Sequence, residues 1–322
     1  REREREREMM KKFPLLDFRG FDDDDDDESM IKSLIDSLSN VGFVAIKISH
    51  EHASIVKKTQ TFAKRTSRNR SSLLLFSKPH FFSKHHKTET LGSVKTTEKY
   101  HHPRKGYSPY ESENFACLLG RKRPNDRVVK YRYVNSEPES ELDETLKTCF
   151  DLMKSISERV LRILAKGLKL DEDYWISTQE NVSTLTANYY PCREEDDELD
   201  MQEHTDVDFI TLVCSDEEGL EIEWSDGTWT KAPFGSDVLI LNVADALSEW
   251  PGLSGTFRST RHRVKCSSSS TGRISLAFFV APHPRTKMCD PFDGSKSEGT
   301  LTYKKWRRRR IARALKALKK AS

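Results

Sequence analysis

The residues RISLAFFV, numbered 273–280, alternate bulky apolar side chains with small or polar ones as far as Phe278, which is typical of a β-strand. Residues two apart in a strand share a face, so Arg273 and Ser275 lie on one face and Ile274 lies on the other. Further β-rich runs precede this strand at 185–190, 209–214, 220–224, 228–231, 238–243 and 262–265, and Asp226-Gly227 favours a hairpin turn between two of them. Many short strands in succession predict a barrel or a sandwich.

Helical periodicity lies outside this β-rich stretch. Residues 31–38 have apolar side chains at helical spacing, with Ser29 as a candidate N-cap and short strands expected on either side at 13–18 and 42–46. The clearest helix covers 139–167, and its apolar stripe is suited to bracing the outside of a β-core, with Gly167 as its end. The predicted fold class is therefore β-rich α+β, with an α/β N-terminal region.

Composition limits the class of protein. The chain has 322 residues, 35% of them hydrophobic and 33% charged, and a net charge of +3. This length suffices for a sizeable core and for about two domains. No run approaches the roughly 20 apolar residues of a membrane span. Residues 1–8 alternate in charge, unlike a secretory signal. We expect a cytoplasmic protein, with a nuclear location as the alternative.

The cysteines are scattered singly, without a CxxC pair. In a chain of this length without a secretory signal, this spacing favours free, mostly buried thiols over disulfides. They are Cys117, Cys149, Cys192, Cys214, Cys266 and Cys289.

Charge is strongly segregated along the chain, with acid in 22–28 and base in 64–105 and 304–320. The histidine-containing basic stretch near 64–103 is typical of a polar loop, and a metal or nucleic-acid role for it is the less favoured alternative. For residues 304–320 we expect a terminal helix packed by its apolar side, with the basic side in water. A nuclear address, or a contact with RNA or a membrane surface, is the alternative.

Two histidines and one aspartate are the candidate metal ligands. His204 and Asp206 are two residues apart, and His262 follows in a later strand. Two imidazoles and one carboxylate can occupy one face of a six-coordinate Fe(II), which leaves the opposite face open for a co-substrate and dioxygen. Zinc or manganese is the alternative, because ligand affinity alone does not select iron.

A series of short motifs surrounds these candidate ligands in a fixed order. They are Asn188-Tyr189-Tyr190-Pro191, Thr211-Leu212-Val213, Gly219-Leu220-Glu221-Ile222, Asn242-Val243-Ala244-Asp245, His262-Arg263-Val264 and Arg273-Ile274-Ser275. The series resembles the 2-oxoglutarate/Fe(II)-dependent dioxygenase superfamily, in the branch that contains isopenicillin N synthase and the plant flavonoid, gibberellin and ethylene-forming oxygenases. The resemblance is strong over 181–285 and weaker over 13–62 and 104–180.

The resemblance implies a domain organisation and a fold. Residues 1–12 would be a low-complexity charged tail and 13–180 an N-terminal α/β region with a basic insertion near 64–103. Residues 181–285 would form a distorted double-stranded β-helix, or jelly roll, braced by helices. Residues 286–322 would be a basic C-terminal helix or tail.

The resemblance also implies roles for individual residues. His204, Asp206 and His262 would bind Fe(II), with 2-oxoglutarate and dioxygen as co-substrates. Arg273, with Ser275 beside it, would hold the distal carboxylate of 2-oxoglutarate by parallel hydrogen bonds. The other assignments are Asn188 and Tyr190 for seating the co-substrate, and Phe209 and Phe279 for an apolar wall of the substrate pocket, with a place in the core as the alternative for both. No catalytic side chain is predicted beyond the metal centre.

Three functions remain open from the sequence. The leading hypothesis is a 2-oxoglutarate-dependent dioxygenase that hydroxylates or desaturates a small organic substrate. The second is an iron oxidase of the isopenicillin N synthase or ethylene-forming type that uses no 2-oxoglutarate. The third is a non-catalytic jelly-roll binding protein with basic tails. For partners we expect a small-molecule substrate, no obligate nucleic acid, no membrane span and a monomeric state.

Overall fold

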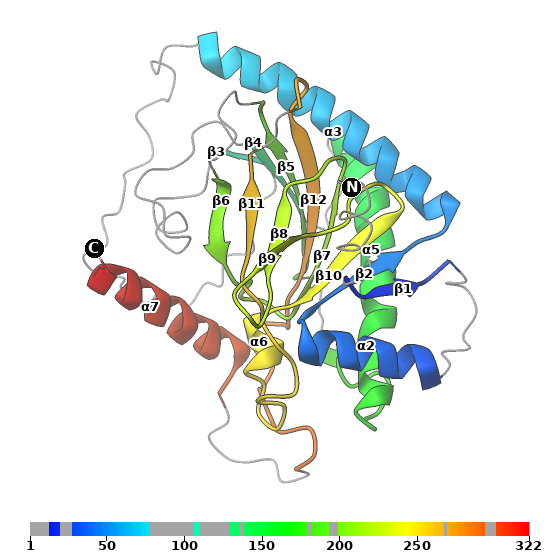
Figure 1. Ribbon diagram of the computed structural model, residues 1–322, viewed down its shortest axis with the longest axis vertical. Coiled ribbons are helices and arrows are strands. Elements are labelled where there is room, and N and C mark those ends of the chain that lie inside the picture. The colour runs from blue at the N-terminus through cyan, green and yellow to red at the C-terminus, as the bar shows by residue number, and fades with distance from the viewer. Residues whose placement is uncertain are drawn as a thin grey trace.

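Two β-sheets form the centre of the molecule (Figure 1). The computed structural model describes residues 13–19, 28–76, 106–109, 129–134, 138, 140–178, 182–192, 199–266, 269–293 and 301–321. The larger sheet has the strand order β1-β2-β10-β7-β12-β5-β4-β3, and the smaller has β6-β11-β8-β9. The strands are β1 Leu15–Asp17, β2 Phe43–Lys47, β3 Gly106–Pro109, β4 Val129–Val134, β5 Thr184–Tyr190, β6 Leu199–His204, β7 Ile210–Ser215, β8 Leu220–Glu223, β9 Trp229–Lys231, β10 Val238–Val243, β11 His262–Lys265 and β12 Arg273–Val280.

Strand β12 pairs antiparallel with β5 on one side and with β7 on the other. In this register Arg273 lies opposite Tyr190, and Ser275 lies opposite Asn188. Directly opposite side chains share a face of the sheet, and so do residues two apart in one strand. The four polar side chains expected to bind the co-substrate are therefore on one face.

An apolar cluster fills the space between the two sheets. Phe43, Tyr190 and Ile240 come from the larger sheet, and Ile222 and Val264 come from the smaller. Because Tyr190 belongs to this cluster, the face of β12 and β5 that carries the predicted polar side chains is turned toward the smaller sheet. The arrangement is the sandwich expected of a jelly roll.

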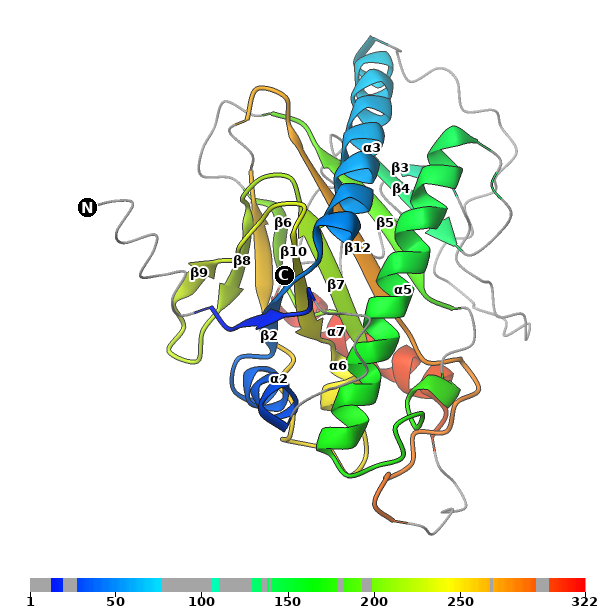
Figure 2. The ribbon, with the colours of Figure 1, turned by 90° about the vertical axis from the view of Figure 1, so that its right-hand side faces the viewer.

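Helices cover the outer face of the larger sheet, where α3 and α5 lie across β5, β7 and β12 (Figure 2). Helix α5 begins after Ser140, whose hydroxyl oxygen accepts a hydrogen bond from the backbone N–H of Asp143 at 3.2 Å. Its apolar stripe is buried, as the sequence predicted. The helices are α2 Glu28–Asn40, α3 His50–Phe76, α5 Glu141–Gly167, α6 Asp245–Ser248 and α7 Tyr303–Ala321, with a 3₁₀ turn η1 at Ile176–Thr178.

The predicted β-rich runs agree with the observed strands to within about one residue at each end, but the runs that form β3, β4 and β6 were not predicted. The hairpin turn between β8 and β9 is confirmed, with Gly227 at φ +82. The prediction of Ser29 as an N-cap is wrong, because α2 begins at Glu28 and Ser29 lies in its first turn.

Gly167 is the last residue of α5, but its importance lies in packing rather than in a left-handed turn. A Cβ added there would lie 2.8 Å from the Ile35 side chain and 3.0 Å from that of Ile31. The left-handed residue near this helix end is Lys169, at φ 58. Gly167 therefore allows α2 to approach the end of α5 closely.

The basic region predicted to be an insertion begins inside a helix, since α3 continues through residue 76. Residues 77–105 and the charged tail 1–12 lie outside the described residues. Within the described residues, no helix has the length and apolar character required to cross a bilayer.

The described cysteines are all free thiols, as predicted. Cys149 and Cys214 are buried, Cys192 is exposed, and Cys266 and Cys289 are partly exposed. The expectation that most of the thiols are buried therefore does not hold for these five. Cys117 lies outside the described residues.

We expect Phe150→Ala to lower the free energy of unfolding by about 3–5 kcal/mol, because a buried aromatic ring would leave a cavity. Phe150 is 1% exposed, and its ring meets those of Tyr133 and Phe278 edge-on at 5.6 and 5.1 Å. Urea unfolding followed by circular dichroism measures the change. Lys147→Ala on the exposed side of the same helix is the control, and an equal loss in both variants would contradict the packing described here.

Candidate metal and co-substrate site

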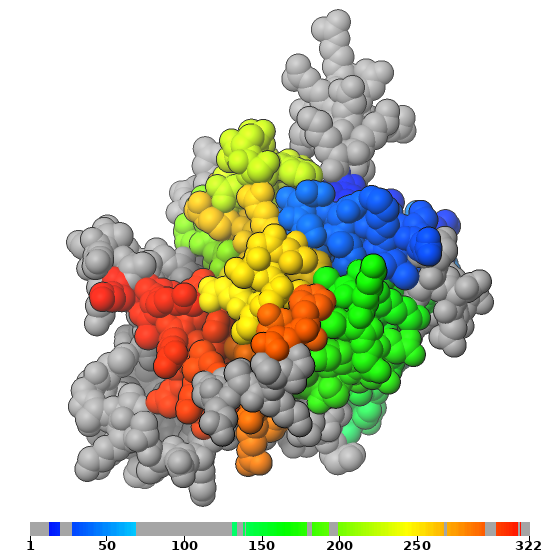
Figure 3. Space-filling model, turned by 90° about the horizontal axis from the view of Figure 1, so that it is seen from below, coloured from blue at the N-terminus to red at the C-terminus, as the bar shows by residue number. Residues whose placement is uncertain are grey.

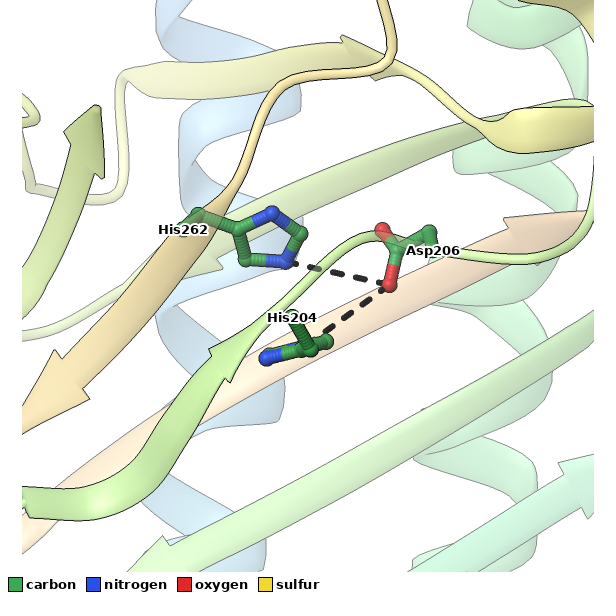
Figure 4. Close-up of side chains that lie close together, drawn as sticks. All are labelled: His204, Asp206 and His262. Carbon is green, nitrogen blue, oxygen red and sulfur yellow. Dashed lines mark ion pairs between the residues drawn. The ribbon is translucent and has the colours of Figure 1, made fainter. Parts of the chain in front are cut away.

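The three predicted metal ligands lie together at one end of the smaller sheet (Figure 4). His204 ends β6 and His262 begins β11, and the two residues are directly opposite each other in the register. Asp206 does not share a strand with His204, because β6 stops at His204 and Asp206 lies in the following loop. The loop nevertheless brings Asp206 Oδ1 to 3.9 Å from His204 Nε2 and 3.8 Å from His262 Nε2.

Backbone carbonyls orient both imidazole rings. His204 Nδ1 lies 2.7 Å from the carbonyl oxygen of Gln202, and His262 Nδ1 lies 3.2 Å from that of Thr260. A carbonyl oxygen only accepts hydrogen bonds, so each Nδ1 carries the proton that it donates. In the neutral rings the lone pairs are therefore on the Nε2 atoms that face Asp206, which is the tautomer a metal ligand needs.

The carboxylate of Asp206 is oriented by two donors. Its Oδ2 accepts hydrogen bonds from the Thr211 hydroxyl at 2.7 Å and from the Asn242 amide at 2.9 Å, which leaves Oδ1 facing the histidines. Burial by itself would raise the pKa of Asp206. The neighbouring His262 and His204, together with these two hydrogen bonds, outweigh burial and hold that pKa below its usual value. Asp206 is therefore ionised at neutral pH.

The donor set fits a divalent first-row metal such as Fe(II). The ligand atoms lie within 4.8 Å of one another, and the three side chains are 8–11% exposed. Asp206 Oδ1 lies 3.9 Å from His204 Nε2 and 3.8 Å from His262 Nε2, distances longer than those of hydrogen bonds. The carboxylate is therefore not bonded to either ring, and the three ligand atoms face one another. Two histidines and one carboxylate on a single face leave the remaining coordination positions free.

Arg273 is buried on the face of the larger sheet that is turned toward the smaller one, with 1% of its surface exposed. Its Nε donates to the Ser215 hydroxyl at 2.8 Å and to the Glu217 carbonyl oxygen at 3.2 Å, and its guanidinium carbon lies 4.9 Å from the centre of the Tyr190 ring. Gly219, at φ +146, lies beside it, where an added Cβ would be 3.2 Å from Nε. Among the described residues, its NH1 nitrogen finds no hydrogen-bond partner.

The other residues predicted to seat the co-substrate lie beside Arg273. Ser275 and Asn188 are opposite each other and are 3% and 5% exposed. The Asn188 Oδ1 atom is buried and has no hydrogen-bond partner within the described part of the chain. Buried polar atoms without partners are rare in folded proteins and indicate a place for a polar ligand or a water molecule.

The two phenylalanines proposed for a substrate wall are placed differently. Phe209 is fully buried, with its ring 4.9 Å from that of Trp175 and 5.5 Å from that of Trp250, so it is a core residue. Phe279 is partly exposed, is opposite Thr211, and shares the face that carries Arg273. The structure therefore corrects the assignment of Phe209, while the assignment of Phe279 stays a prediction.

Sequence reasoning gave no role to several residues that orient the site. They are Thr211 and Asn242, which hold Asp206, the carbonyls of Gln202 and Thr260, which hold the histidines, and Ser215 and Glu217, which hold Arg273. Thr211 and Asn242 are buried polar residues in otherwise apolar strands, and this contrast was a usable signal. The carbonyl contacts depend on backbone geometry and leave no mark in the sequence.

Comparison with known proteins agrees with this geometry. Residues 181–282 match the family model of the 2OG-Fe(II) oxygenase superfamily, so this segment of the chain is similar to that superfamily. Proteins of that superfamily use Fe(II), 2-oxoglutarate and dioxygen, and His204, Asp206 and His262 of this chain could hold such a metal ion. A UPF0676 protein of Schizosaccharomyces pombe is 35% identical over 46% of this chain and 49% of the relative. Gibberellin 2-beta-dioxygenase 3 of Arabidopsis thaliana is 33% identical over 40% of each chain. The chain thus spans half or less of the length of these two relatives.

The fold extends beyond the matched segment. A Neurospora crassa protein, solved at full length in complex with alpha-KG, superimposes with a TM-score of 0.64 over 92% of this chain and 95% of that chain, at 21% sequence identity. This likeness confirms the predicted double-stranded β-helix fold.

We expect His204→Ala to abolish tight binding of Co(II), a spectroscopic substitute for Fe(II), because the two ligands that remain do not hold the metal as three do. Titration monitored by the visible absorption of Co(II) is the measurement. His283→Ala, in the loop after β12, is the control and should bind as the wild type does. Undiminished Co(II) binding by His204→Ala would show that the metal binds elsewhere.

Proposed function

We propose that this chain is an Fe(II)- and 2-oxoglutarate-dependent oxygenase that hydroxylates or desaturates a small organic substrate, while 2-oxoglutarate becomes succinate and CO₂. The observation that carries the proposal is the buried charge of Arg273. Both partners of its Nε are neutral, and no carboxylate of the described residues pairs with it. A buried cation without a counter-charge is costly, so the site favours an anionic ligand.

The residues around Arg273 suit a carboxylate. A guanidinium can present two parallel N–H groups to the two oxygens of a carboxylate, and the NH1 nitrogen is available for this pairing. The Ser275 hydroxyl, on the same face, can supply a further donor. Because these groups are shielded from water, each hydrogen bond contributes more than it would on the surface. Asn188 and Tyr190 lie on the same face as Arg273 and would orient the bound acid.

The metal ligands would hold Fe(II) at the other end of this co-substrate. When bound, Fe(II) supplies the reaction with dioxygen, and 2-oxoglutarate supplies the reducing electrons. The chain's part is to direct the Nε2 atoms of both imidazoles toward the metal through the carbonyls of Gln202 and Thr260, and to orient Asp206 through Thr211 and Asn242. Holding the donors in place before the metal binds lowers the cost of ordering them.

Phe279 is the candidate apolar contact, since it is partly exposed and lies opposite Thr211, the residue that bonds Asp206. A partly exposed ring at this position suits a substrate with an apolar surface. We therefore propose a small, largely apolar organic substrate.

The test is anaerobic addition of 2-oxoglutarate to the protein loaded with Fe(II). We expect a visible metal-to-ligand charge-transfer band in the wild type and its loss in His204→Ala. In Arg273→Leu the half-saturating 2-oxoglutarate concentration should rise by about tenfold or more, because charge-assisted hydrogen bonds are lost. Arg285→Leu, an exposed arginine in the loop after β12, should leave the titration unchanged.

Two results would overturn the proposal in different ways. If Fe(II) binds but 2-oxoglutarate gives no band, the chain is instead an iron oxidase without this co-substrate. If neither Fe(II) nor Co(II) binds, the metal centre itself is wrong, and a non-catalytic binding protein becomes the better interpretation.

A further inference from the structure

The C-terminal helix α7 turns several of its arginines inward. We expected its apolar side to pack and its basic side to lie in water. Tyr303 and Trp306 are indeed buried, but three arginines of the same helix form ion pairs with acidic residues of other segments. The pairs are Arg307 with Asp208 at 3.3 Å, Arg310 with Asp245 at 2.7 Å and Arg313 with Glu249 at 2.7 Å. Figure 3 shows the red helix lying against the yellow segment that contains α6.

These contacts fall on two short segments of the chain. One is the loop that carries Asp206, and the other is α6 with the residue after it. In the first segment the Tyr303 hydroxyl also donates to Asp208 Oδ1 at 2.5 Å. The helix therefore packs directly on the loop that carries a metal ligand.

Asp245, the first residue of α6, connects these segments. Its Oδ2 accepts hydrogen bonds from Arg310 Nε at 2.7 Å and from the Thr205 hydroxyl at 3.2 Å. Its Oδ1 accepts from the Ser259 hydroxyl at 2.7 Å, and its backbone N–H donates to the Asp206 carbonyl oxygen at 2.9 Å. One carboxylate thus links α7 to both chain segments that carry metal ligands.

The positions of Thr205 and Ser259 make this link relevant to the metal. Thr205 lies between His204 and Asp206. Ser259 precedes Thr260, whose carbonyl oxygen holds the His262 ring. Arg310 also reaches Thr205 directly, with NH2 3.2 Å from its hydroxyl oxygen. Displacement of Asp245 would therefore move the segment with His204 and Asp206 relative to the segment with His262.

The charge of Arg310 is what keeps Asp245 in place. The side chain of Asp245 is 8% exposed and that of Arg310 is 22% exposed, so this pair is largely shielded from water. Removing one partner of a buried pair leaves an uncompensated charge, which draws water in or forces the group outward. Arg313 of the same helix pairs with Glu249, but these side chains are 60% and 39% exposed, so loss of this pair leaves no buried charge.

We propose that Arg310 of α7 is a positioning residue for the metal centre: through Asp245 and Thr205 it fixes the His204–Asp206 segment relative to His262, and this one contact raises the affinity for the metal. The inference rests on the proposed metal-binding function and goes beyond it, since Arg310 touches neither the metal ligands nor the co-substrate site.

The experiment compares Co(II) binding by the full-length wild type and Arg310→Met, with the thermal midpoint of each measured alongside. We expect the Kd of Arg310→Met to rise by about tenfold, as is typical when a group that orients metal ligands is lost. Arg310→Lys, which keeps the charge but cannot reach Asp245 and Thr205 together, should show a smaller rise. Arg309→Met and Arg313→Met are matched controls on the same helix and should bind as the wild type does.

A second variant separates positioning from general loss of stability. Thr205→Val removes the hydroxyl between Arg310 and Asp245 and leaves the buried ion pair intact, so it should fold normally. If both residues act through one contact, the effects on Kd will be non-additive, and Thr205→Val/Arg310→Met will bind little worse than Arg310→Met alone.

The proposal is overturned if Arg310→Met binds Co(II) with wild-type affinity, or if Arg313→Met weakens binding equally, which would indicate a general effect of helix docking. It is also overturned if Arg310→Met fails to fold while Thr205→Val binds normally. Failure of the wild type to bind Co(II) would instead reject the proposed metal centre, so the two failures are distinguishable.

Discussion

The pairing of β12 with β5 is the constraint on which the rest of the site depends. Its register places Arg273 beside Tyr190 and Ser275 beside Asn188, on the face turned toward the smaller sheet. A slip of one residue would turn every one of these side chains outward, because the side-chain period of a strand is two. The bulky residues of β12 on the opposite face hold the register by packing against α3 and α5.

The two sheets carry different parts of the site. The smaller sheet supplies the histidines, whose rings are oriented by backbone carbonyls, and the larger sheet supplies Arg273, the cation proposed to bind the co-substrate acid. Asp206 belongs to neither sheet, and it is connected to the larger one through Thr211 on β7 and Asn242 on β10. The geometry of the metal centre therefore depends on the distance between the sheets, which the apolar cluster between them maintains.

The sequence predicted much of this arrangement. Alternation located the strands from β7 onward, and the order of His204, Asp206 and His262 picked out three side chains that the structure brings together, while the role of Arg273 stays a prediction. Prediction from the sequence failed where contacts between distant parts of the chain determine the position of a side chain. Phe209 is an aromatic residue of the kind that can line a pocket, but its ring packs between two tryptophans in the core. The basic residues of α7 suggest a face exposed to water, but Arg307 and Arg310 form ion pairs with acidic residues distant in the sequence. Such pairings are non-local, so no local pattern encodes them.

The uncompensated guanidinium of Arg273 has a consequence for the resting protein. Burying this charge without a counter-charge lowers the free energy of unfolding whenever no acid is bound. The ligand-free protein is therefore less stable than it would be with a well-paired or apolar residue at this position. Anything that supplies the counter-charge stabilises the native state by mass action. The lifetime of this protein in a cell would then follow the concentration of its organic acid, so that starvation for the co-substrate acts on protein abundance as well as on turnover.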